Sequence, residues 1–183
     1  MVSTSTNVMK NGDYNMADYK KLIPTVLKWE GNFCGNIDGM ICTMKGVTLA
    51  TFRKFYGAKM NCTNLRNITN DQWNTIFKKG FWDRWKGDDI DNQAIANLLV
   101  DWVWASGVWG IKYPQQVLGV KADGIVGLKT LAAINYYPNK RELFYKLWNR
   151  RKQHFEDICK RDPSKKKFLR GWLNRLSDFK YFE

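Results

Sequence analysis

Apolar residues recur every three or four positions along most of the chain, a spacing that is typical of amphipathic helices. The first such stretch begins after Asp18, which can cap a helix, and continues to about Trp29. Pro24 lies a little past the first turn, so this helix either starts late or bends there. Gly31 is placed to end it.

The same periodicity predicts helices along the rest of the chain. Thr48 can cap a helix that ends at Gly57, and Thr69 or Asn70 can begin a pair of short helices that Gly80 separates. Further helices are expected at 91–107, 113–120, about 127–135, 139–160 and 163–179.

The alternation that is typical of strands is missing from the sequence, apart from a short hairpin expected within 32–47. Residues 1–16 read as a polar tail, and the "KADG" turn near Lys121 marks a seam between an N-terminal and a more basic C-terminal part. The pattern therefore predicts a mostly α protein.

One acidic residue lies where an apolar stripe is expected. Leu22, Val26 and Glu30 are four residues apart, so they share one face of the first helix. A carboxyl group in apolar surroundings loses solvation of its charged form, and we therefore expect the pKa of Glu30 to be raised. Such a group at a helix end suits general-acid cleavage of a glycosidic bond. The alternative is an ordinary surface glutamate in the last turn.

A loop of small residues follows Glu30. Asp38 lies eight residues after it and Thr43 thirteen, and a loop that crosses back over the helix end could place both opposite Glu30. Glycosidases use a second polar group across the scissile bond, either to stabilise positive charge or to hold water. Asp38 and Thr43 are equally suited to turns, so a purely structural role stays open.

The chain is strongly basic. Its formal net charge is +13, and residues 139–183 contain 14 basic and 6 acidic residues, a net +8. This balance favours polyanionic partners such as nucleic acid, an anionic membrane surface or an acidic cell-wall polymer, although a solvated helix face would look the same. No stretch resembles a signal peptide or a membrane span, so we expect a soluble chain that does not insert into membranes.

Metal and cofactor chemistry is not expected. The chain has no CxxC pair and a single histidine, His154, so we predict no zinc site and no cofactor. Cys34 and Cys42 flank the loop after Glu30 and could close it by a disulfide, but without a secretion signal reduced thiols are the default, for Cys62 and Cys159 as well.

Several segments, in order, resemble the glycoside hydrolase family 108 muramidases. The opening "LKWEGNF", a small-residue loop and "TMKGVTLATFRKFYG" resemble the Glu-Gly-Gly-Tyr and Thr-x-x-Gly-Ile/Val-Thr motifs of the family. "DNQAIANLLVDWVWASG" is similar to its mid-chain helix. "QQVLGVKADGIVGLKTLAAIN" and "FLRGWLNRL" resemble the start and end of the predicted peptidoglycan-binding domain that follows. The resemblance covers roughly residues 18–176.

The resemblance implies a lysozyme-like all-α fold and cleavage of the β-1,4 bond between N-acetylmuramic acid (MurNAc) and N-acetylglucosamine (GlcNAc), with Glu30 as proton donor. Asp38 and Thr43 align more loosely, because the loop is a residue or two short and lacks the Asp-Pro and Gly-Gly of the family. Ala105 stands where the family usually has Asn, so one polar contact with the sugar could be missing. Stacking of the sugar on Trp104 or Trp109 could replace it, although a role in the core stays open for either tryptophan. Implied substrate contacts are Gly31, Gly46, Trp104, Ser106 and Trp109.

It also implies a lysozyme-like catalytic domain at 17–110 and a helical peptidoglycan-binding subdomain at 111–183. The expected partner is the peptidoglycan glycan strand, without nucleic acid, and we expect a monomer. Because no signal peptide is recognised, we expect a chain made in the cytoplasm that acts on the cell wall in the periplasm or after release. Family members are also labelled secretion activators, which fits such a role.

Two other functions stay open. A catalytically inactive peptidoglycan-binding module would fit the departures in the loop. A nucleic-acid-binding protein would fit the basic charge, with "ADGIVGLKTLAAIN" and the following helix as the binding unit, but it gives the Glu30 loop no role.

Overall fold

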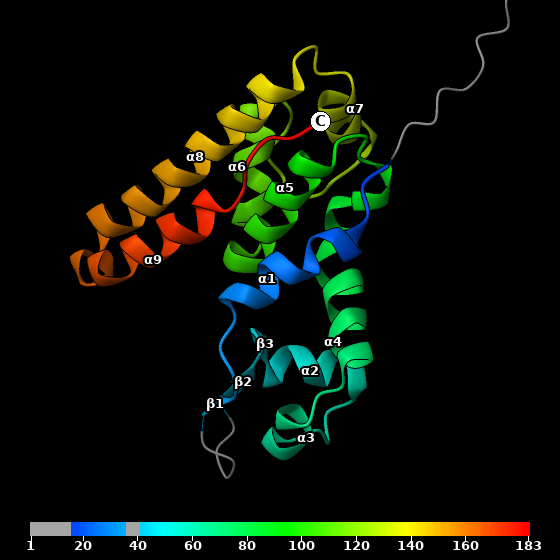
Figure 1. The fold of residues 1–183 in the computed structure, drawn as a ribbon, viewed down its shortest axis with the longest axis vertical. Helices are drawn as coiled ribbons and strands as arrows, with labels where there is room; N and C mark the ends of the chain where they lie inside the picture. The colour runs from blue at the N-terminus through cyan, green and yellow to red at the C-terminus, as the bar shows by residue number, and fades with distance from the viewer. Residues whose placement is uncertain (1–15, 36–40) are drawn as a thin grey trace, which may run out of the picture.

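The structure is a computed structural model that describes residues 16–35 and 41–183. Asp38 and the tail before residue 16 lie outside the described residues. The described part is mostly α-helical, with one small sheet (Figure 1).

The first predicted helix is divided into two helical segments. Asp18 caps a 3-10 turn, η1 (Tyr19–Lys21), and α1 (Ile23–Trp29) follows with Pro24 in its first turn. A proline is tolerated at this position because its missing N–H would be unpaired in any case. The late start that Pro24 predicted is therefore confirmed, and Glu30 is the residue at which α1 ends.

A three-stranded antiparallel sheet follows, larger than the predicted hairpin. β1 (Cys34–Gly35) pairs with β2 (Cys42–Met44), which pairs with β3 (Val47–Thr48). Thr48 then caps α2 (Leu49–Tyr56) through its side chain, and α3 (Cys62–Arg66) packs beside β2. Together these elements form the lower lobe in Figure 1.

The bridge between Cys34 and Cys42, which the sequence left open as an alternative to reduced thiols, does not form. Cys42 pairs instead with Cys62, and the Cα atoms lie 5.9 Å apart. Cys34 is free and exposed, and Cys159 is free and buried. The partner could not be read from the sequence, because α3 returns to β2 only through tertiary packing. The expectation of reduced thiols was therefore wrong for Cys42 and Cys62.

The break predicted at Gly80 was wrong as well. Thr69 caps α4 (Asn70–Phe77), which continues without a break into a π-helical segment, η2 (Lys78–Trp82), and then into a 3-10 turn, η3 (Asp83–Trp85). A glycine permits a helix end but does not require one, and here burial of Phe77 and Trp82 on either side of Gly80 favours the helical path. After the short turn η4 (Gly87–Asp89), Asn92 caps α5 (Gln93–Ser106), which Gly107 ends.

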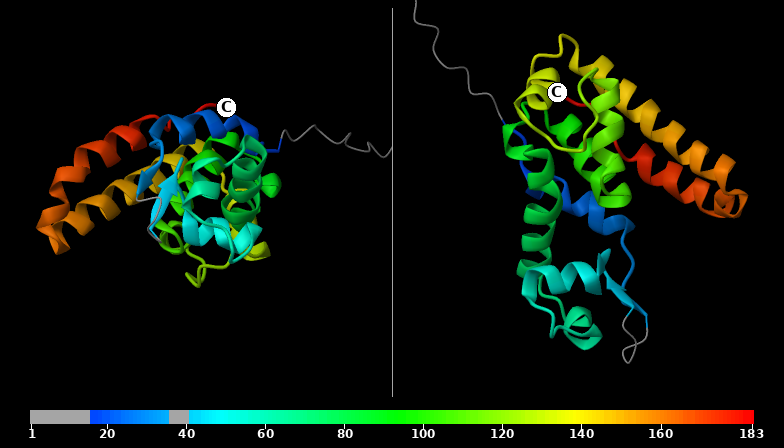
Figure 2. Two further views of the ribbon diagram at one scale, coloured as in Figure 1. Left: turned by 90° about the horizontal axis from the view of Figure 1, so that it is seen from below. Right: turned by 180° about the vertical axis from the view of Figure 1, so that it is seen from behind.

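The remaining helices complete the C-terminal part of the chain, and two of them pack against α5. α6 (Trp109–Val117) starts four residues earlier than predicted and accommodates Pro114, and α7 (Leu128–Asn135) begins after Gly127 as predicted. α8 (Lys140–Arg161) is followed by η5 (Pro163–Lys165) and α9 (Lys166–Ser177). α8 and α9 lie side by side and extend away from the rest of the molecule (Figures 1 and 2).

One hydrophobic core connects the two halves of the chain. It contains residues of α1 and β2 together with residues of α8 and α9. α5 lies in this core and is buried on nearly all sides. Within the described residues, none of the helices has the length and apolar character needed to cross a bilayer.

Candidate active site

Glu30 is the first residue after α1, in the short segment that leads to β1. Its backbone has left the helix (φ −94°, ψ 132°), and its side chain is 14% exposed. The indole Nε1–H of Trp104 and a guanidinium N–H of Arg175 both donate hydrogen bonds to Glu30 Oε1, each at 2.7 Å. No described residue donates a hydrogen bond to Oε2. The carboxylate is thus held by one oxygen.

Trp104 and Gly46 form the immediate surroundings of this carboxylate. Trp104 is half-buried and packs against Trp73, Phe77 and Phe81, with ring centroids 4.5–5.7 Å apart. Gly46 has a positive φ of 76°, and a Cβ there would lie 2.5 Å from both Glu30 Oε2 and Trp104 Cζ2. Only glycine therefore fits between the sheet and the carboxylate.

A buried cluster of charges lies behind Glu30. Asp101 on α5 is completely buried and accepts hydrogen bonds from two arginines. Arg175 on α9 approaches it with Nε (3.2 Å to both oxygens) and Nη2 (2.6 Å to Oδ1), which leaves Nη1 directed at Glu30. Arg151 on α8, also completely buried, donates through Nη2 to Asp101 Oδ2 at 2.7 Å.

Burial and charge pairing act in opposite directions on these groups. Burial favours the neutral form of Asp101, but the two arginines outweigh it and hold the pKa of Asp101 below its usual value. For Arg175, burial is outweighed by Asp101 and Glu30, so its pKa is raised. For Arg151, burial prevails over the attraction of Asp101, and the charge of Arg175 acts in the same direction as burial, so the pKa of Arg151 is lowered.

The other residues implied by the resemblance lie around this centre in different settings. Gly31 is exposed, and its carbonyl accepts a hydrogen bond from Lys45 N at 3.1 Å. Thr43 is half-buried on β2, where it pairs with Thr48 of β3. Ser106 is half-buried at the end of α5, and Trp109, at the start of α6, is 48% exposed.

Trp109 belongs to an aromatic surface that continues inward. It stacks on Tyr113, with ring centroids 5.2 Å apart, and Arg150 lies 3.7 Å above the Tyr113 ring. Behind Tyr113, His154 is buried, and its Nδ1 has no hydrogen-bond partner among the residues that the structure describes. Burial, followed by the charges of nearby arginines, lowers the pKa of His154 to about 4.

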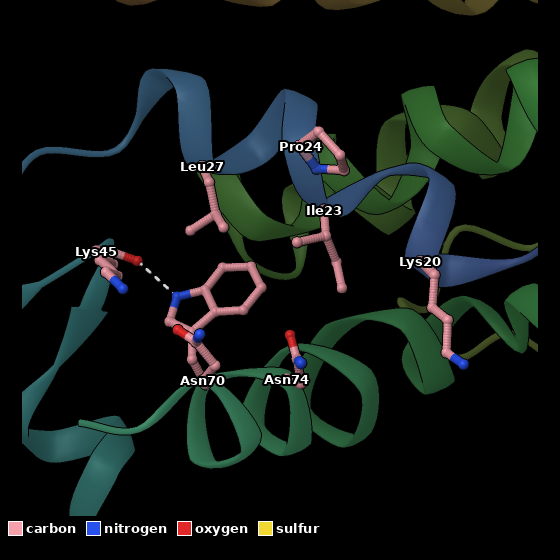
Figure 3. A pocket seen from close by; sticks show the side chains of 8 residues that line it. Lys20, Ile23, Pro24, Leu27, Lys45, Asn70 and Asn74 are labelled. Carbon is pink, nitrogen blue, oxygen red and sulfur yellow. Dashed lines mark hydrogen bonds between the residues drawn. The ribbon is translucent and has the colours of Figure 1, made fainter.

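A cavity of about 260 Å³ lies between α1 and α4 (Figure 3). Ile23 and Leu27 of α1 line one side and Asn70 and Asn74 of α4 the other, while the Trp73 indole donates to the carbonyl of Lys45. Glu30 is not among the residues that line it, so this cavity is separate from the carboxylate.

Among the described residues there is no group of three or more His, Cys, Asp or Glu side chains that could hold a metal ion. The contacts of Glu30 are those of a carboxyl group held by two hydrogen-bond donors, one of which belongs to a guanidinium.

Sequence reasoning missed Arg175, although one signal could have indicated such a residue. Asp101 stands in the middle of an otherwise apolar helix, and a buried carboxylate requires a cationic or hydrogen-bonding partner. That signal predicts an arginine or lysine from elsewhere in the chain, but it does not identify which of the 30 basic residues provides it.

Comparisons with known proteins agree with this architecture. Residues 23–107 match the glycosyl hydrolase 108 family, and residues 109–177 match a family described as a predicted peptidoglycan domain. The structure of Brucella abortus SagA is similar, with a TM-score of 0.74 and 27% sequence identity over 88% of this chain and 90% of that chain. The search of curated proteins found no match. The chain thus carries a segment that matches the glycosyl hydrolase 108 family, followed by one that matches a predicted peptidoglycan domain, on a mostly helical, lysozyme-like fold, as the resemblance predicted.

Proposed function

We propose that this protein is an N-acetylmuramidase that cleaves the β-1,4 bond between MurNAc and GlcNAc in peptidoglycan, with Glu30 as the general acid. The family matches support a glycoside hydrolase that acts on peptidoglycan. The bond and the residue that cleaves it are our proposal. The observation that carries it is the way in which the Glu30 carboxylate is held.

Both hydrogen-bond donors contact Oε1 of Glu30, and no described residue donates to Oε2. In the protonated acid, Oε2 is therefore the oxygen that carries the proton, because Oε1 already accepts two hydrogen bonds. A general acid must present its proton to the leaving oxygen while the rest of the carboxyl group stays fixed. Glu30 meets this requirement with its side chain 14% exposed.

In the proposed reaction, Glu30 transfers its proton from Oε2 to the glycosidic oxygen while the C1–O bond breaks and the sugar ring passes through an oxocarbenium-like state. Asp38 or Thr43 would hold the water or stabilise the positive charge on the opposite face. A second group that only positions water leads to inversion, whereas a carboxylate close enough to attack C1 leads to retention.

The remaining predicted contacts keep distinct roles in this proposal. Gly46 permits the close approach of the sheet to the carboxylate, and Trp109 offers an exposed ring on which a sugar can stack. Gly31 and Ser106 remain candidate substrate contacts. The Cys42–Cys62 bridge favours action outside a reducing cytoplasm, since disulfides persist in oxidising compartments.

The decisive experiment is digestion of purified Gram-negative peptidoglycan, with the new reducing ends identified by mass spectrometry. A muramidase creates reducing MurNAc ends, whereas a glucosaminidase creates reducing GlcNAc ends. We expect Glu30→Gln to lose activity by at least about 100-fold while it keeps its fold. Glu142→Gln is the matched control, because Glu142 is half-exposed on α8 and pairs with Lys146 at the surface.

Three results separate the proposal from its rivals. Reducing GlcNAc ends, or full activity in Glu30→Gln, would refute it. Co-sedimentation with peptidoglycan without cleavage by the unaltered chain indicates a binding module. Salt-sensitive DNA binding by a chain that neither cleaves peptidoglycan nor co-sediments with it indicates the nucleic-acid-binding alternative.

A further inference from the structure

Arg175 connects the two family segments at the candidate acid. It lies on α9, within the predicted peptidoglycan domain, and it is 145 residues away from Glu30 in the sequence. Its guanidinium nevertheless donates to Glu30 Oε1 at 2.7 Å, and the two side chains are only 15% and 14% exposed. A contact so well shielded from water is stronger than a surface ion pair.

The orientation of this guanidinium is fixed from behind. Nε and Nη2 both bind the carboxylate of Asp101, so the third nitrogen, Nη1, can point in only one direction, toward Glu30. Asp101 is itself held by Arg151 and by its buried place on α5. Arginine suits this position because its planar fork binds two carboxylates at fixed angles, which the single ammonium of lysine does not.

We propose that Arg175 is a positioning residue for Glu30 and that the predicted peptidoglycan domain therefore contributes directly to the catalytic unit. This inference rests on the proposed function of Glu30. Arg175 keeps Oε1 occupied, which leaves Oε2 for proton transfer. It also stabilises the negative charge that forms on Glu30 when the proton leaves.

The charged groups around Glu30 define how Arg175 affects the reaction. Arg175 approaches from α9, with Asp101 on α5 and Arg151 on α8 behind it. From the sheet side the neighbour is Gly46, which carries no charge, and the side chain of Lys45 lines the separate cavity between α1 and α4. Arg175 is therefore the cation in direct contact with the carboxylate.

The test compares Arg175→Met with Arg170→Met in the full chain. Arg170 lies on the same helix but is exposed, so it controls for the loss of one arginine and its charge from α9. In Arg175→Met the pair of Asp101 and Arg151 remains, so the buried charges stay balanced. We expect the rate of reducing-end release to fall by about 10- to 100-fold. Co-sedimentation with peptidoglycan should stay within about twofold of the unaltered chain.

Two further readouts distinguish positioning from a structural role. Steady-state kinetics on soluble peptidoglycan fragments should show the loss of Arg175→Met in kcat, with KM within about twofold of the unaltered chain, because the contact matters most when the proton leaves Glu30. Arg175→Lys, which keeps the charge without the fork, should recover part of the rate. A loss confined to KM, or a rate within about twofold of the unaltered chain, overturns the proposal.

The inference can also be tested without hydrolysis. In a double-mutant cycle on unfolding, Glu30→Gln combined with Arg175→Met should destabilise less than the sum of the two single variants, because the contact is lost only once. Additive effects would overturn the inference even if the chain cleaves peptidoglycan. Conversely, failure to cleave combined with clear coupling would refute the muramidase proposal but leave the contact established.

Discussion

Asp101→Asn tests the buried charge cluster most directly. The substitution keeps the size of the side chain but removes the negative charge that faces Arg151 and Arg175. Arg151 is completely buried, and among the described residues its Nε and Nη1 have no hydrogen-bond partner, so Nη2 carries its hydrogen bond to the Asp101 carboxylate. Its other contacts are with the rings of Phe155 and Phe179, whose centroids lie 5.6 Å away. Without Asp101, the Arg151 cation has no other carboxylate within ion-pair distance among the described residues.

The expected cost follows from this geometry. Leaving one partner of a buried ion pair uncompensated destabilises a protein by about 3–5 kcal/mol. For a chain of this size each kcal/mol lowers the melting temperature by about 2–4 °C. Asp101→Asn should therefore lower it by roughly 6–20 °C. Urea unfolding at neutral pH, followed by tryptophan fluorescence and by circular dichroism, measures the free energy directly.

Two companion variants make the result interpretable. Glu142→Gln removes a half-exposed carboxylate from a surface pair with Lys146 and should cost less than about 1 kcal/mol. Arg151→Met combined with Asp101→Asn should be more stable than Asp101→Asn alone, because the orphaned cation is gone. A loss in Asp101→Asn no larger than that in Glu142→Gln would refute the account of the cluster.

Three other predictions follow from the described residues. Gly46→Ala should reduce hydrolysis by at least about tenfold, because its Cβ would lie 2.5 Å from the Glu30 carboxylate and the Trp104 indole. The control is Gly171→Ala on α9, where nothing lies within 4 Å and the change should be neutral or slightly stabilising. Equal rates of hydrolysis in the two variants would contradict the prediction. His154 has a folded pKa of about 4 against 6.5, so the unfolded chain takes up its proton first as the pH falls. The free energy of unfolding should therefore be highest above pH 6.5 and fall by up to about 3 kcal/mol as the pH is lowered toward 4. Urea titrations of His154→Phe should not show this pH dependence. Replacing Cys42 and Cys62 by serine should lower the free energy of unfolding by about 3 kcal/mol. Thiol titration of the unaltered chain in denaturant should detect two thiols before reduction and four after it.

Local signals in the sequence predicted the boundaries of several helices. Thr48 and Thr69 cap their helices through the side-chain hydrogen bonds expected of them, and Gly107 ends α5. Such signals act within one turn of the backbone, so no tertiary information is needed. Gly80 shows where they fail: packing of the aromatic residues around it outweighed the weak helix-breaking tendency of a single glycine.

Contacts between distant segments could not be predicted in the same way. The spacing of Leu22 and Val26 predicted that Glu30 shares their face of the first helix, but α1 ends at Trp29 and Glu30 lies just beyond it. The pattern also gave no indication of the guanidinium of Arg175. The partner of Cys42 was missed for the same reason, since a sequence shows which residues can pair but not which are brought together.

The charges around Glu30 also suggest why a cation beside a general acid is compatible with catalysis. While Glu30 carries its proton, the single negative charge of Asp101 faces two arginines, and the cluster has an excess positive charge. In the proposed reaction, proton transfer to the glycosidic oxygen creates the carboxylate that restores the balance. Arg175 thus interacts more strongly with the transition state than with the protonated ground state, and only such a difference accelerates the chemical step. It follows that Arg175→Met should act mainly on the rate of cleavage and little on the binding of peptidoglycan.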